Sequence, residues 1–141
     1  MDWQECKNKK FVKEINVDKN LIKSLIGSSE KKFKTNKRIK IDETTASTKV
    51  SIIYEALRGI LEALAIKKGF KIYNHECFCS FLYEICNDKI FSLKFDKLRR
   101  IRNQINYYGK DISVNEAKNI IKDIALLRQD ILNKYFKKGE K

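Results

Sequence analysis

The sequence predicts an all-α protein, an antiparallel up-and-down helical bundle of four to five helices. The 141-residue chain has no proline and only five glycines, which disfavours a β-rich fold with many tight turns. Apolar residues make up 43% of the chain, enough to build one hydrophobic core. Long amphipathic segments alternate with short connections, as they do when neighbouring helices run antiparallel.

The first two predicted helices lie in the N-terminal half. Asp18 is a good N-cap for a helix that continues to about Lys40, and its apolar periodicity fades after Gly27, where the pattern allows a kink or a frayed end. The second helix starts near Asp42 or Thr44 and ends before Gly69, after two lysines in its last turn. Its apolar seam recurs at spacings of three and four residues: Ala46, Val50, Ile53, Leu57, Ile60 and Leu64.

Three more helices are predicted in the C-terminal half. The third covers about 74–87, and the fourth covers about 92–108 before a glycine. The fifth begins with a capping box, in which Ser113 and Glu116 satisfy each other's backbone N–H groups, and continues through Tyr135.

We expect one folded domain, because no second domain or internal repeat is visible. Residues 1–17 are interpreted as an N-terminal arm, 18–136 as the helical bundle, and 137–141 as a disordered basic tail. No apolar stretch reaches the ~18 residues that a membrane-spanning helix needs. The charged N-terminus lacks the apolar run of a signal peptide, so we expect a cytoplasmic protein without membrane contact.

A formal net charge of +13 favours an anionic partner. The charge is uneven: residues 1–41 carry +7, residues 42–90 carry −1, and residues 91–141 carry +7. Basic ends of this kind favour nucleic acid or an acidic protein by long-range attraction. The alternative is that the lysines only solvate helix surfaces.

The cysteines and the single histidine predict neither a metal nor a cofactor. Four potential ligands lie within twelve residues, at His75, Cys77, Cys79 and Cys86, without the usual spacing of zinc ligands. On a helix, Cys77 and Cys79 point about 160° apart. We therefore expect His75 to help cap a helix and the thiols to pack in the core. Without an export signal, we expect no disulfide framework.

Three arginines within four residues distinguish the fourth predicted helix. Arg99, Arg100 and Arg102 form a cationic cluster suited to bidentate contacts with phosphate. Arg102 lies at the margin of the apolar seam, and Asn103 and Asn106 lie on the same flank. The alternative is a solvated helix face on which a partly buried arginine pairs with a carboxylate.

At Arg102-Asn103-Gln104-Ile105-Asn106-Tyr107 the chain resembles the HEPN superfamily, whose late helix commonly carries Arg-Asn-x-Ile-x-His. The resemblance extends over about residues 18–136. It implies a homodimer in which two motif helices form one cleft. HEPN domains occur beside nucleotidyltransferases and in RNA-targeting toxins and defence systems. In active members, the motif supports metal-independent RNA cleavage through the 2′-hydroxyl.

The departure from this pattern is Tyr107, which stands where the family has histidine. A tyrosine with a pKa of about 10 is only ~0.1% ionised at pH 7. Losing a well-placed general base lowers the rate by about 10²–10⁴-fold. In a regular helix Tyr107 also lies about 140° from Arg102, so both reach one site only if the last turn unwinds or a dimer partner supplies one of them.

The sequence therefore predicts a HEPN-like domain that binds RNA or nucleotide with a degenerate catalytic motif. The candidate catalytic residues are Arg102, Asn103 and Tyr107. The candidate nucleic-acid-binding or nucleotide-binding residues are Arg99, Arg100, Arg102 and Asn106. Two alternatives stay open: a metal-independent endoribonuclease of the toxin or defence type that uses Arg102 with Tyr107, and a helical interaction partner of a nucleotidyltransferase.

Overall fold

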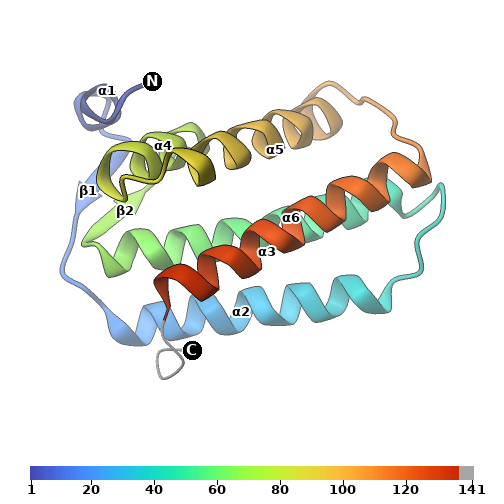
Figure 1. Cartoon of the computed structure of the whole chain (residues 1–141), viewed down its shortest axis with the longest axis horizontal. Coiled ribbons are helices and arrows are strands. Elements are labelled where there is room, and N and C mark those ends of the chain that lie inside the picture. The colour runs from blue at the N-terminus through green and yellow to red at the C-terminus, as the bar shows by residue number, and fades with distance from the viewer. Residues whose placement is uncertain (137–141) are drawn as a thin grey trace.

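The fold is built around α3 (Ala46–Lys67), most of whose residues are buried. The computed structural model describes residues 1–136, in which the long helices extend along the longest dimension of the molecule (Figure 1). Helices α2 (Lys19–Arg38) and α6 (Val114–Tyr135) make the most extensive contacts with α3. The helices pack antiparallel, which confirms the predicted fold class.

The predicted helix starts and stops are largely confirmed. The Asp18 side chain accepts a hydrogen bond from the backbone N–H of Leu21 and so caps α2. The capping box of Ser113 and Glu116 is present at the start of α6. Helix α2 continues through Gly27 to its end without the break that the pattern allowed.

The third predicted helix consists of two pieces in the structure. They are α4 (His75–Ser80) and a π-helical segment, η1 (Phe81–Ile85). The Asp88 side chain then accepts from the N–H of Phe91 and caps α5 (Lys89–Tyr107), which begins three residues earlier than predicted.

The N-terminal residues add elements that the sequence did not predict. Helix α1 (Trp3–Asn8) and strand β1 (Val12–Glu14) lie at one end of the bundle (Figure 1). Strand β1 pairs antiparallel with β2 (Phe70–Ile72). The Trp3 ring packs against the rings of Phe70 in β2 and Phe81 in η1. Residues 1–17, interpreted from sequence as an arm, are therefore packed on the bundle. The described residues contain six α-helices, because α1 and the short α4 add to the four long ones.

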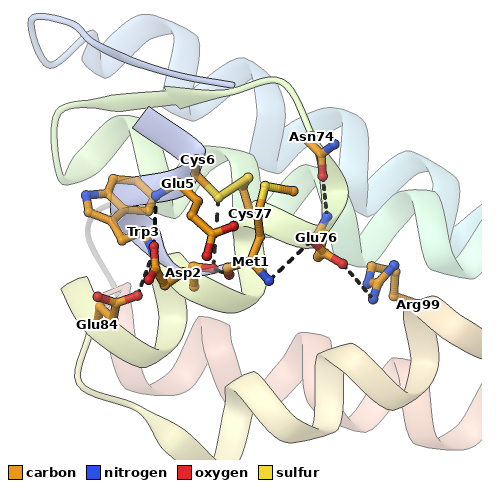
Figure 2. The surroundings of a disulfide bond; sticks show 11 residues. Met1, Asp2, Trp3, Glu5, Cys6, Asn74, Glu76, Cys77, Glu84 and Arg99 are labelled. Carbon is orange, nitrogen blue, oxygen red and sulfur yellow. Dashed lines mark hydrogen bonds and ion pairs between the residues drawn. A yellow bond between two sulfur atoms is a disulfide. The ribbon is translucent and has the colours of Figure 1, made fainter. Parts of the chain in front are cut away.

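The prediction of no disulfide is wrong, because Cys6 of α1 is bonded to Cys77 of α4 (Figure 2). The prediction rested on the missing export signal, whereas the bond follows from the docking of α1 on α4. The sequence alone could not predict the contact between α1 and α4, because the two cysteines are 71 positions apart.

The two remaining cysteines, Cys79 and Cys86, are free thiols and half-buried. Burial, together with the charge of Asp96, raises the pKa of the Cys79 thiol to about 12, so it stays protonated and is a poor metal ligand. Among residues 1–136, no group of three histidine, cysteine, aspartate or glutamate side chains could hold a metal ion.

No helix within residues 1–136 is long and apolar enough to span a membrane. The tail predicted at 137–141 lies outside the described residues.

Candidate nucleic-acid interface

A surface pocket forms where the C-terminal half of α5 passes the junction between β2 and α4. Its volume is about 470 Å³. Residues from both segments line it: Tyr73, Asn74, His75, Glu76, Arg99, Arg102, Asn103 and Tyr107. We call this the α4–α5 pocket. It contains all three candidate catalytic residues.

Arg102 is largely buried, and its guanidinium is held by long contacts. Its side chain is 13% exposed. Nη1 donates hydrogen bonds of 3.3 Å to both Asn103 Oδ1 and Tyr107 Oη, while Nη2 lies 3.6 Å from Glu55 Oε1. The guanidinium carbon is 4.9 Å from the centre of the Tyr54 ring, a cation–π contact. Nε is buried and has no hydrogen-bond partner within the described residues.

Arg99 is held more tightly than Arg102. Its Nη2 donates to Asp96 Oδ1 at 2.8 Å and lies 3.9 Å from Glu76 Oε1. Figure 2 shows Glu76 between Arg99 and the amino group of Met1. Because a carboxylate already takes its best hydrogen bond, Arg99 has less capacity than Arg102 for another anion.

Arg102 and Tyr107 meet on one chain without unwinding of the helix. Helix α5 stays helical through Tyr107, and the Tyr107 hydroxyl still accepts from Arg102. The expectation that only an unwound turn or a dimer partner could bring them together is therefore wrong. That expectation was based on the directions of the two Cα–Cβ bonds. The side chains of Arg102 and Tyr107 are long enough to meet although these bonds point about 140° apart.

Two of the predicted binding residues do not line the pocket. Arg100 is 71% exposed and donates from Nε to Asp96 Oδ2 at 2.9 Å. The Oδ1 atom of Asn106 accepts a 2.9 Å hydrogen bond from Ser51 Oγ on α3. Of the predicted binding set, only Arg99 and Arg102 line the α4–α5 pocket.

The pocket also contains His75, for which the sequence predicted a capping role. Asn74 caps α4 instead, by accepting from the N–H of Glu76. The His75 ring lies with Nδ1 3.1 Å from the hydroxyl of Tyr54, a fully buried residue of α3. The only sequence signal for His75 was that it is the single histidine of the chain.

Burial and neighbouring cations lower the pKa of His75. Burial contributes most, and the charges of Arg58 and Arg102 act in the same direction. Since the ordinary value is 6.5, the imidazole is mainly neutral at pH 7. The pocket therefore combines guanidinium donors with a neutral imidazole.

Comparison of the chain with protein-family models, curated proteins and solved structures found no match. The resemblance to the HEPN superfamily thus stays a prediction from the α5 motif. The function has to be inferred from the pocket itself.

Proposed function

We propose that this protein binds RNA or nucleotide in the α4–α5 pocket, with Arg102 as the main phosphate ligand. The observation that carries this proposal is the state of the Arg102 guanidinium. The guanidinium lies over the Tyr54 ring, and within residues 1–136 its only carboxylate contact, to Glu55, is 3.6 Å long. Its two hydrogen bonds, to Asn103 and Tyr107, are both 3.3 Å long. A phosphate oxygen forms shorter, charge-assisted hydrogen bonds of about 2.7–2.9 Å with arginine.

Two exposed tyrosines favour a nucleotide as the ligand over an inorganic anion. Tyr73 and Tyr107 line the same pocket and are 56% and 69% exposed. Aromatic rings beside a cationic group are the usual elements of single-strand recognition, because every base can stack on them. Tyr73 and Tyr107 are therefore the side chains that contact the bases in this proposal.

The charge of the whole chain supports the same class of ligand. A formal net charge of +13 attracts polyanions over long distances, whereas specificity depends on contacts inside the pocket. The homodimer, the nucleotidyltransferase partner and the cytoplasmic location predicted above stay predictions. The pocket as described lies within one chain and needs no second copy to bring Arg102, Tyr107 and His75 together.

Replacing Arg102 tests the proposal, with Arg100 as the matched control. Arg102→Ala should weaken binding of a labelled single-stranded RNA by about 1–3 kcal/mol, or roughly 5- to 150-fold, the range for a hydrogen bond to a charged group. Arg100→Ala removes the same charge from the same helix outside the pocket, and should weaken binding by less than about threefold. Fluorescence anisotropy measures both affinities.

The salt dependence of binding completes this experiment. Loss of one phosphate contact should reduce the slope of log affinity against log salt by about 0.7 for a single strand in Arg102→Ala. Equal losses in the two variants would show that RNA is held by diffuse charge and not by the pocket. Absence of RNA and nucleotide binding by the wild-type protein would show that the proposed function is wrong.

A further inference from the structure

We propose that His75, which lies outside the α5 motif, accepts the proton of an RNA 2′-hydroxyl in the α4–α5 pocket, so that the pocket cleaves the RNA it binds. This inference rests on the proposed function and goes beyond it. It assigns the proton acceptor to α4, whereas the motif position on α5 is occupied by Tyr107.

Tyr54 is the residue that connects the two reactive groups. Its hydroxyl is hydrogen-bonded to His75 Nδ1 at 3.1 Å, and the Arg102 guanidinium lies 4.9 Å from the centre of its ring. Tyr54 is fully buried and also stacks on Phe95, with ring centres 5.9 Å apart. A rigid core side chain therefore positions both the imidazole and the guanidinium on the wall of one pocket.

The hydrogen bond to Tyr54 engages one ring nitrogen of His75 and leaves the other available. Within residues 1–136, Nε2 forms no hydrogen bond, whereas Nδ1 has Tyr54 as its partner. When the proton is on Nδ1, the imidazole donates to the Tyr54 oxygen and Nε2 carries the free lone pair. Nε2 is then the atom that accepts a proton from a bound ligand.

The charges around His75 keep it in the form that a base requires. Burial, Arg58, Arg102 and Arg99 lower its pKa, and Glu55 partly opposes them. The titratable and charged groups that surround it are Tyr54, Glu55 and Arg58 on α3, Tyr73 after β2, Glu76 on α4, and Arg99, Arg102 and Tyr107 on α5. A lowered pKa means that the neutral imidazole persists below pH 6.5 in the free protein.

The reaction balances without metal, cofactor or oxidant. The 2′-hydroxyl proton moves to His75 Nε2 while the 2′ oxygen forms a bond to the adjacent phosphorus. The bond from phosphorus to the 5′ oxygen breaks, and that oxygen takes a proton from water. The imidazolium then releases its proton to solvent. The products are a 2′,3′-cyclic phosphate and a 5′-hydroxyl, and Arg102 stabilises the charge that develops on the phosphoryl oxygens.

Binding and cleavage of one labelled single-stranded RNA should be measured together in the presence of EDTA. The wild-type protein should release fragments with 2′,3′-cyclic phosphate ends, and an RNA that is 2′-O-methylated throughout should bind without being cleaved. His75→Gln should lower the cleavage rate by about 10²–10⁴-fold while affinity changes by less than about threefold. Added imidazole should restore part of the rate to His75→Ala, which a purely structural role would not allow.

The pH profile of the wild-type enzyme is a second test that needs no variant. The ratio kcat/KM reports the free enzyme and should rise with pH to a plateau, with a midpoint below 6.5. An unchanged cleavage rate in folded His75→Gln, or a midpoint of the kcat/KM profile above pH 6.5, would overturn the role of His75. RNA that is bound but not cleaved by the wild-type protein would overturn it too and leave the proposed function intact. Failure to bind RNA or nucleotide at all would overturn both.

Discussion

Reduction of the Cys6–Cys77 disulfide is expected to lower the free energy of unfolding by about 2–4 kcal/mol. The bond joins residues 71 positions apart, so breaking it gives the unfolded chain many more conformations. For a chain of this length the loss corresponds to a fall in Tm of roughly 10 °C. Thermal unfolding followed by circular dichroism, with and without a thiol reductant, measures it.

Two cysteine variants control this experiment. Cys6→Ser should reproduce the low Tm without reductant and should not respond to reductant further. Cys86→Ser removes a free thiol and should keep the full response of the wild type. A wild-type Tm that does not change on complete reduction would show that the bond between α1 and α4 adds nothing to stability.

Arg128→Ala is expected to lower the free energy of unfolding by about 3 kcal/mol. Arg128 on α6 is only 2% exposed, yet it carries a charge. Its Nε donates to Ser29 Oγ at 2.9 Å and its Nη2 to Glu30 Oε2 at 2.8 Å, both on α2. The guanidinium also lies 4.8 Å from the centre of the Phe33 ring. Alanine would remove all these contacts and leave a cavity between α2 and α6.

Arg128→Met separates packing from charge. Methionine fills most of the space without the hydrogen bonds, so urea unfolding should show a loss of less than half of that in Arg128→Ala. Glu30 is 45% exposed and stays hydrated when its partner is removed. The loss of unfolding free energy in Arg128→Ala is therefore at the lower end of the range for breaking a buried ion pair. Losses below about 0.5 kcal/mol in both variants would contradict the account, because that is the range of ordinary surface substitutions.

The parts of the fold that the sequence predicted are those governed by local interactions. The N-cap at Asp18 and the capping box of Ser113 and Glu116 involve residues three positions apart, so sequence spacing describes them fully. The pairing of β1 with β2 and the Cys6–Cys77 bond depend on how distant segments pack. Strands of three residues are too short to show the alternation of apolar and polar residues that reveals a strand.

The candidate site divides in the same way. Arg102, Asn103 and Tyr107 lie in one short motif, and the structure places them in one pocket. His75 and Tyr73 reach that pocket from the junction of β2 and α4, which no local pattern connects to α5. The exclusion of Arg100 has a local cause: two helical positions separate it from Arg102, which turns it to the opposite side of α5.

The single histidine of the chain permits the most direct test of the claim that the α4–α5 pocket is the nucleotide site. Its ring protons give one resolved pair of signals in a proton NMR spectrum, and a 2′-O-methylated RNA can be added without cleavage. We predict that the His75 signals shift saturably, at the RNA concentration that saturates binding, in wild type and Arg100→Ala. In Arg102→Ala the same shift should require RNA concentrations that are higher by the factor by which this variant weakens binding. RNA that saturates the wild-type protein while the His75 signals do not move would contradict the account, because the ligand would then bind elsewhere.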